Sequence, residues 1–235
     1  MTRRLMLLRH GQTEFNATRR MQGHIDTELS ATGVAQARAV ADYLATQNIG
    51  TILCSDLQRA KVTAEVIGAK AGVTPVVDAR LRETNLGVWQ AKTHEEVDAA
   101  YPGARAAWRH DATWAPPEGE SRMQVAARAR AVIDELMHTY EQWDSSTVLV
   151  VAHGGTISAL TSSLLALDVN QYPMFSGLGN TCWAQLTARP RFTPGSTDAM
   201  GPGDEVPPSA MFNSTNIDGA QWYLDGWNMG VALGK

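Results

Sequence analysis

The sequence predicts an α/β fold, a three-layer sandwich with a mostly parallel central sheet and helices on both faces. Short apolar runs that suit buried strands alternate with segments whose apolar residues recur at helical spacing. A chain of 235 residues is long enough for one sizeable α/β domain, whereas two full domains would be cramped. We therefore expect a single domain over residues 1–235.

The first half of the chain alternates strand, helix, strand, helix, strand. These elements are expected at residues 5–8, about 31–44, 51–54, about 57–71 and 76–77. In the first helix Val34, Ala37 and Ala41 follow the spacing of one helical face. Ser30 is a suitable cap for its start, and Gly72 is a suitable stop signal for the second helix.

The second half begins with short helices and ends with edge-like strands. Helices are expected at residues 93–100, 104–110, 122–140 and 156–167, and strands at 147–152, 181–187 and 221–224. Pro102-Gly103 separates the first two helices, and Ser121 caps the long one. Residues 188–209 are rich in Pro, Gly, Ser and Thr without apolar periodicity, so we expect a long surface loop there.

Composition excludes several classes of function. The net charge of -4 provides no basic surface for nucleic acid. No apolar run approaches the roughly 20 residues of a membrane helix, and the apolar stretch near the N-terminus is too short for a signal peptide. We therefore expect no membrane partner and a cytoplasmic location. Cys54 and Cys182 are expected to be reduced core residues, and no Cys/His spacing resembles a zinc site.

The two most informative motifs begin where apolar runs end. Residues 5–8 lead directly into Arg9-His10-Gly11, and residues 148–152 lead into His153-Gly154-Gly155. Open α/β sheets bind ligands at the carboxyl ends of their strands, so both histidines are expected at one functional edge. A guanidinium beside an imidazole suits a phosphate, because the guanidinium binds oxyanions and a neutral imidazole can attack phosphorus.

The chemistry of these residue types suggests individual roles. A neutral His10 imidazole can attack phosphorus in line and become phosphohistidine, which divides one difficult displacement into two. Arg9 and Arg59 are candidate clamps for the three phosphoryl oxygens, on which charge gathers in the transition state. His153 is the candidate for a second cationic or donor group on these oxygens. Gly154 lets the backbone approach the anion at the start of the following helix.

Four separated blocks make the chain resemble the histidine phosphatase superfamily, which has the phosphoglycerate-mutase-like fold. They are Leu8-Arg9-His10-Gly11-Gln12-Thr13 with Asn16, Ser55-Asp56-Leu57-Gln58-Arg59-Ala60, Leu81-Arg82-Glu83 with Gly87-Val88-Trp89-Gln90, and Val151-Ala152-His153-Gly154-Gly155. The blocks stand in the family's order, and the resemblance extends from about residue 5 to about residue 186.

The resemblance implies a set of site residues and no cofactor or metal. The implied catalytic set is His10, Glu83, Arg9, Arg59 and His153. The implied substrate- and phosphate-binding set is Asn16, Gln22, Gly23 and Gly154. Glu83 is expected to protonate the leaving oxygen and then to deprotonate the attacking water, with Glu14 as its nearest rival.

Several activities within the family fit these blocks. A phosphatase is favoured over a cofactor-dependent phosphoglycerate mutase, because the stretch between Glu83 and Ser121 is short for such a mutase. A broad-specificity phosphomonoesterase remains an alternative. A binding protein without catalysis is a more distant one, because the complete catalytic set is present.

Further blocks at residues 103–122 and 177–183 resemble family members that act on glucosyl-3-phosphoglycerate. The resemblance implies a small phosphorylated sugar acid as substrate, glucosylglycerate as product and a role in methylglucose lipopolysaccharide synthesis. We expect a substrate rim formed by Trp108, Trp114, Arg105, Arg109 and His24. The tryptophans suit a hexose face and the arginines a glycerate carboxylate, although the tryptophans could instead pack a helical subdomain. A homodimer is left open.

Overall fold

The computed structural model of the chain describes residues 2–191 and 211–231. In these ranges six strands form one sheet in the order β3-β2-β4-β1-β5-β6. The strands are β1 (Arg3–Arg9), β2 (Ile49–Cys54), β3 (Val76–Val77), β4 (Thr147–Ala152), β5 (Trp183–Arg189) and β6 (Gln221–Met229). Strands β1 to β4 pair in parallel, and β5 and β6 join as antiparallel strands. The predicted α/β class with a mostly parallel sheet is confirmed.

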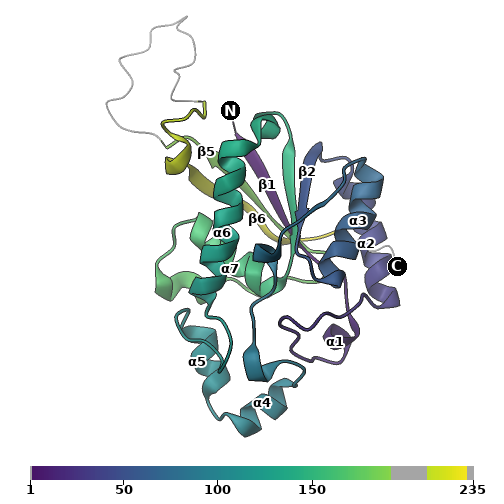
Figure 1. The fold of residues 1–235 in the computed structure, drawn as a ribbon, viewed down its shortest axis with the longest axis vertical. Coiled ribbons are helices and arrows are strands. Elements are labelled where there is room, and N and C mark those ends of the chain that lie inside the picture. The colour runs from purple at the N-terminus through teal and green to yellow at the C-terminus, as the bar shows by residue number, and fades with distance from the viewer. Residues whose placement is uncertain (1, 192–210, 232–235) are drawn as a thin grey trace, which may run out of the picture.

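Helices cover both faces of this sheet, as Figure 1 shows. They are α1 (Glu14–Ala17), α2 (Ala31–Leu44), α3 (Gln58–Ala71), α4 (His94–Ala100), α5 (Ala104–His110), α6 (Arg122–Thr139) and α7 (Gly154–Leu164). Helices α2 and α3 lie on one side of the sheet and α6 and α7 on the other. No described helix has both the length and the apolar character needed to cross a bilayer.

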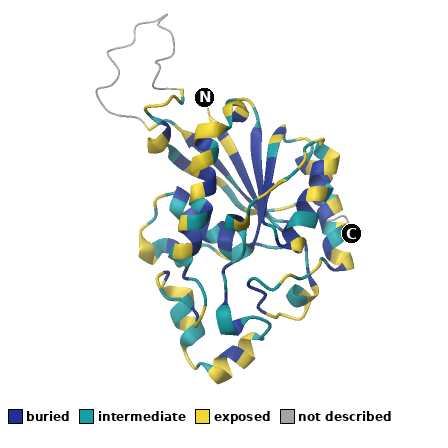
Figure 2. Cartoon of the chain, in the orientation of Figure 1, coloured by how far each residue is buried: buried dark blue, intermediate teal, exposed yellow. Residues whose placement is uncertain are grey.

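Side chains alternate along β1, so that this strand contributes to an apolar core on each face of the sheet. Leu5 and Leu7 belong to the cluster that contains the apolar residues of α6 and α7. Met6 and Leu8 face the cluster that contains those of α2 and α3. A strand covered on both faces is apolar over its buried stretch, and Figure 2 shows the central strands mainly in dark blue. The buried strand therefore holds Arg9, its last residue, and His10, which follows it, in a rigid position.

The helix caps follow from local sequence. The Ser30 hydroxyl accepts a hydrogen bond from the Gly33 amide at 3.1 Å, and Ser121 forms a capping box with Gln124. Gly72 ends α3 in the left-handed conformation, with φ of 72°. These signals explain why the predicted helix starts at 31 and 122 agree with the structure.

Several predicted boundaries differ from the structure, three of them near the site or at the end of the sheet. Helix α7 begins at Gly154 rather than at Thr156, because His153 already has the extended conformation of a cap residue. Strand β6 continues past residue 224 to Met229, because its pairing with β5 continues. The predicted surface loop begins too early, because Ala188 still pairs with Trp222 in the sheet. The rest of that loop, residues 192–210, lies outside the described residues.

Helices α4 and α5 lie beyond the carboxyl ends of the strands, at the bottom of Figure 1. They have a small apolar cluster of their own, separate from the two cores of the sheet. It contains Met21, Leu86, Trp89 and Val97, with Val88, Tyr101, Ala104, Trp108 and Trp114 packed against it. Because the cluster does not share residues with the sheet cores, α4 and α5 form a distinct wall on the side where the strands end.

Candidate active site

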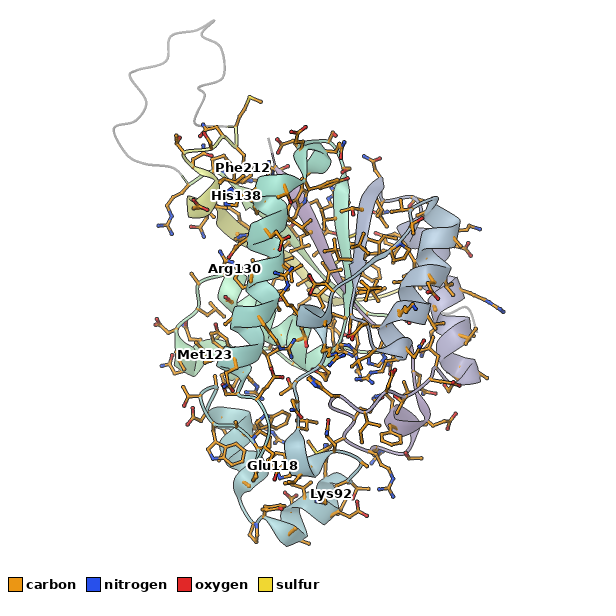
Figure 3. All side chains as sticks on the ribbon, in the orientation of Figure 1. Lys92, Glu118, Met123, Arg130, His138 and Phe212 are labelled. Atoms are coloured by element: carbon orange, nitrogen blue, oxygen red, sulfur yellow. The ribbon has the colours of Figure 1, made fainter. Side chains whose placement is uncertain are left out.

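A cavity of about 470 Å³ opens at the carboxyl end of the parallel strands. Its lining residues are Arg9, His10, Asn16, Arg20, Gln22, Gly23, Arg59, Glu83, Thr84, Leu86, His94, Trp108, Arg122, Gly154, Gly155, Ser158, Phe175, Ser176, Gly177 and Leu178. Figure 3 shows nitrogen-bearing side chains gathered below the lower ends of the strands, above α4 and α5. The cavity is therefore rich in hydrogen-bond donors and suits an anion.

His10 is held as a neutral imidazole with one free ring nitrogen. Its side chain is buried directly after β1, and Nδ1 lies 2.7 Å from the Gly11 carbonyl oxygen. Burial and the charges of Arg9 and Arg59 lower the pKa of His10 well below its usual value. Since a carbonyl oxygen can only accept, Nδ1 carries the proton and Nε2 keeps its lone pair. This is the form that a nucleophilic imidazole needs.

His153 has the opposite arrangement of ring nitrogens. Arg59 Nε donates to His153 Nδ1 at 3.2 Å, so Nδ1 is the acceptor and Nε2 carries the proton. Burial and the charges of Arg59, His10 and Arg9 lower the pKa of His153 well below its usual value. Its buried Nε2 has no hydrogen-bond partner among the described residues. The two imidazole rings are 5.1 Å apart, so a nucleophilic nitrogen and a donor nitrogen stand side by side.

Two arginines, the buried Arg59 and the half-buried Arg9, complete this part of the cavity. Arg59 Nη1 donates to Ile25 O at 2.7 Å, and Nη2 donates to Gly23 O at 2.8 Å. Burial lowers the pKa of Arg59 to about 10, so its guanidinium stays charged at neutral pH. Arg9 donates to the Leu178 carbonyl, and its buried Nε has no partner in the described ranges. Fixed guanidinium groups of this kind stabilise developing negative charge without having to reorganise.

Glu83 is bound to the first turn of α7. Its carboxylate oxygens accept hydrogen bonds from Thr84 N at 2.8 Å, Gly155 N at 3.2 Å and Thr156 N at 3.1 Å. A Cβ on Gly155 would lie 2.5 Å from Glu83 Oε1, closer than real contacts allow. The glycine therefore permits this approach of the carboxylate, which places Glu83 in the cavity lining together with His10.

Asn16 and Gln22 present donors to the cavity because threonines occupy their acceptors. Asn16 Oδ1 accepts from the Thr13 amide at 3.1 Å. Gln22 Oε1 accepts from Thr13 Oγ1 at 3.0 Å and from Thr27 Oγ1 at 2.5 Å. The NH₂ groups of both amides remain available, and both residues line the cavity. Their geometry fits the expected contacts to phosphate oxygens.

The backbone of Glu83 is fixed by two residues outside the cavity lining. His24 Nε2 lies 2.7 Å from Glu83 O, so this predicted rim residue lies against the backbone of Glu83 rather than at the cavity surface. Arg128 donates to the carbonyls of Arg80, Arg82 and Glu83 at 2.7, 2.7 and 2.8 Å. No local motif marks Arg128, because it reaches these carbonyls from α6, more than forty positions along the chain.

The predicted rim is only partly assembled. Trp108 lines the cavity, whereas Trp114, Arg105 and Arg109 are absent from the lining formed by the described residues. Trp114 packs on Trp89 with ring centroids 5.5 Å apart. Arg105 forms an ion pair with Asp98 of the preceding helix. These contacts hold both side chains inside the α4–α5 unit, away from the substrate position we expected.

The rival acid Glu14 is also outside this lining, and its side chain is exposed in α1. Arg20, His94 and Arg122 line the cavity although the sequence motifs did not single them out. Burial and Arg105 lower the pKa of His94, which favours its neutral form. The only signal in the sequence was their position at the start of a helix. His94 directly follows the capping residue Thr93, and Arg122 directly follows the capping residue Ser121.

A sulfur or metal site is not evident among the residues that the structure describes. Cys54 and Cys182 are both free thiols. Residues 2–191 and 211–231 hold no cluster of three or more His, Cys, Asp or Glu side chains that could bind a metal ion. The donors in the cavity are mainly N–H groups, which suit oxyanions rather than cations.

Comparison with known proteins identifies similar chains. A profile of the histidine phosphatase superfamily (branch 1) matches residues 5–193. The glucosyl-3-phosphoglycerate phosphatase of Mycobacterium tuberculosis is 45% identical over 231 residues, which is 96% of this chain and 94% of that protein. A probable phosphoglycerate mutase, GpmB, of Yersinia pestis is 37% identical over 169 residues, or 70% of this chain and 75% of the relative.

A solved structure has the same fold. It is the mycobacterial glucosyl-3-phosphoglycerate phosphatase in complex with VO3, with a TM-score of 0.83 and 43% sequence identity. The match covers 96% of this chain and 99% of that one. The likeness therefore extends over nearly the entire length of both proteins.

Proposed function

This chain belongs to the histidine phosphatase superfamily, and on that premise we propose that it hydrolyses glucosyl-3-phosphoglycerate through a phosphohistidine at His10. The products are glucosylglycerate and inorganic phosphate. One observation carries the chemistry: a buried imidazole with a free Nε2 lines a cavity together with two arginines and a carboxylate, and a donor imidazole packs directly beside it. The near full-length similarity to glucosyl-3-phosphoglycerate phosphatases supports the choice of substrate.

In the first step His10 Nε2 forms a bond to phosphorus while the bond from phosphorus to the glycerate oxygen breaks. Positive charge develops on the imidazole, and the Gly11 carbonyl oxygen stabilises this charge by accepting a hydrogen bond from Nδ1–H. Arg9, Arg59 and the Nε2–H of His153 bind the phosphoryl oxygens, on which negative charge accumulates.

Glu83 acts as the general acid in the first step and as the general base in the second. An alkoxide is a poor leaving group, so the Glu83 carboxyl gives its proton to the departing oxygen. In the second step the resulting carboxylate takes a proton from water as the water oxygen attacks the phosphohistidine. The bond from phosphorus to His10 Nε2 then breaks, which releases phosphate and restores both side chains.

Replacement of His10 by Ala tests the nucleophile. We expect kcat for glucosyl-3-phosphoglycerate to fall by more than about 1,000-fold and the acid-labile phosphoenzyme to disappear. Phosphate release is measured with and without EDTA, and we expect no loss in EDTA because guanidinium and N–H groups bind the phosphate. A variant that turns over near the wild-type rate would refute the mechanism.

The same assay separates the alternatives. Release of phosphate is compared among glucosyl-3-phosphoglycerate, 3-phosphoglycerate and hexose phosphates, with a separate measurement of the interconversion of 2- and 3-phosphoglycerate. We expect the highest kcat/KM for glucosyl-3-phosphoglycerate. Equal values for all substrates indicate a broad-specificity phosphatase, and rapid interconversion indicates the mutase activity suggested by the Yersinia relative.

A further inference from the structure

The substrate proposed above carries two separate anionic groups, and the phosphate accounts for only one of them. The other is the carboxylate of the glycerate unit. Arg9 and Arg59 lie beside the two histidines and are assigned to the phosphate. A second cationic group in the same cavity is therefore needed if the enzyme is to recognise the sugar acid as an acid.

Two other arginines, Arg20 and Arg122, line the cavity. Arg20 is already neutralised, because its Nη1 pairs with Glu96 Oε2 at 3.3 Å and donates to Ala91 O at 2.8 Å. Its side chain is also 40% exposed to solvent. The remaining imidazole, His94, has a pKa that burial lowers. Neither residue is a strong candidate for a carboxylate.

Arg122 differs from Arg20 in each of these respects. It is the first residue of α6, adjacent to Met123, which Figure 3 labels at the end of α6 nearest to α5. Its guanidinium lies 5.2 Å from the ring centroid of Trp108, and Nη1 donates to Arg109 O at 2.7 Å. No carboxylate of the described chain lies within ion-pair distance of it.

These contacts orient the guanidinium and leave most of its donors available. A guanidinium has five N–H groups, and only one of them is occupied by the Arg109 carbonyl. The Trp108 ring lies against the guanidinium and restricts its motion, which reduces the entropy lost when a bidentate contact forms. Arg122 also stays half-buried, and nearby Arg109 adds a second positive charge. An anion at this position would relieve that repulsion.

We propose that Arg122 binds the carboxylate of the glycerate unit, and that it thereby selects phosphorylated sugar acids over neutral phosphate esters. This inference rests on the proposed function and names the carboxylate contact within that same cavity. It replaces the expectation that Arg105 or Arg109 serves this purpose, because neither belongs to the cavity lining. Trp108 contributes by holding the guanidinium in place.

The test uses a pair of ligands that differ only in the carboxylate. Inhibition constants of 3-phosphoglycerate and of glycerol 3-phosphate are measured against hydrolysis of p-nitrophenyl phosphate by the full-length enzyme. For Arg122→Met we expect the constant for 3-phosphoglycerate to rise about 10-fold or more, since it loses a charged hydrogen-bond pair. The constant for glycerol 3-phosphate should change less than about 3-fold, and Arg122→Lys should restore part of the difference.

Two further variants separate a direct contact from a general loss of charge. Arg130→Met removes a half-buried arginine of the same helix that pairs with Asp134, and it should leave both inhibition constants unchanged. Arg109→Met tests the rival arginine. A carboxylate-selective effect in Arg109→Met but not in Arg122→Met overturns the proposal. So does equal weakening of both ligands in Arg122→Met, no weakening at all, or a wild-type enzyme that does not favour the carboxylate ligand.

Failure of the proposed function has a different signature. If the wild-type enzyme does not release phosphate from glucosyl-3-phosphoglycerate, the substrate assignment is wrong. The inhibition constants still report the carboxylate contact of Arg122 in that case, because p-nitrophenyl phosphate is the reporter substrate. The thermal unfolding midpoint of each variant is recorded, so that a folding defect is recognised by a lowered midpoint.

Discussion

At the scale of single residues, His10 and His153 show how one side-chain type performs two tasks. A backbone carbonyl holds Nδ1 of His10, whereas a guanidinium N–H holds Nδ1 of His153. The opposite partners leave a lone pair on one Nε2 and a proton on the other. The sequence predicted the positions of both histidines from the strand ends, but not the tautomer of His153, because Arg59 lies 94 positions from it.

The role of Glu83 predicts a dependence on the leaving group. Glu83→Gln keeps the shape of the side chain but has no proton to give. An aryl phosphate needs little protonation, whereas the alkoxide of a sugar acid needs much. We expect kcat/KM for glucosyl-3-phosphoglycerate to fall about 10²- to 10⁴-fold and that for p-nitrophenyl phosphate to fall far less. Equal losses on the two substrates would place the acid elsewhere.

Glu14 provides the matched comparison for this prediction. It was the rival acid in the sequence, and its exposed side chain is outside the cavity lining of the described residues. Glu14→Gln should therefore keep the wild-type ratio of kcat/KM between the aryl and sugar-acid substrates. A shift in this ratio comparable to that of Glu83→Gln would show that the two carboxyl groups share the task.

At the scale of elements, the start of α7 places the carboxylate in the site. The Gly155 and Thr156 amides donate to Glu83, and the absence of a side chain on Gly155 makes room for the carboxylate. The sequence indicated a glycine turn that opens to an anion. It did not indicate that the protein's own carboxylate occupies these amides, since Glu83 comes from a segment 72 positions earlier.

Gly155→Ala tests this contact. The new Cβ would meet Glu83 Oε1 at 2.5 Å and Thr84 Oγ1 at 2.8 Å, so the carboxylate must move. We expect kcat/KM for glucosyl-3-phosphoglycerate to fall about 10-fold or more, with a smaller loss for p-nitrophenyl phosphate. Gly219→Ala is the control, because a Cβ there meets no atom within 4 Å. A Gly155→Ala enzyme with unchanged rates on both substrates would contradict the assigned contact.

The wall formed by α4 and α5 shows the limit of sequence reasoning for an element. Helical spacing predicted both helices, but it could not tell which arginine faces the cavity. Arg105 turns toward Asp98 of the preceding helix, while the cavity receives Arg122 from the next helix. Both outcomes depend on packing between helices, which a local pattern does not contain. Strand ends are easier to predict, because parallel strands place their carboxyl ends at one edge.

At the scale of the whole molecule, the two buried imidazoles link stability to pH. Both have pKa values well below 6.5 in the folded protein, so they stay neutral while an unfolded chain takes up protons below that pH. The unfolded state then binds more protons, and folding stability falls as pH decreases. Below pH 6.5 each imidazole should reduce the free energy of unfolding by up to about 1.4 kcal/mol per pH unit.

Urea unfolding at several pH values measures this slope. His153→Asn removes one of the two imidazoles, so we expect its slope to be smaller by about the contribution of one proton. His10→Asn should reduce the slope by a similar amount, because it also removes one buried imidazole. A slope that both substitutions leave unchanged would mean that the imidazoles are protonated in the folded protein.

The separate apolar cluster under α4 and α5 has a consequence for how such an enzyme diverges. Met21, Trp89 and Val97 pack there without sharing residues with either core of the sheet. Substitutions in this wall can change which leaving group the enzyme accepts, while the residues at the strand ends continue to catalyse phosphoryl transfer. Mutations that change substrate preference are thus uncoupled from those that would abolish turnover. Such an enzyme can therefore evolve to hydrolyse new phosphate esters through substitutions in this wall without first losing its activity.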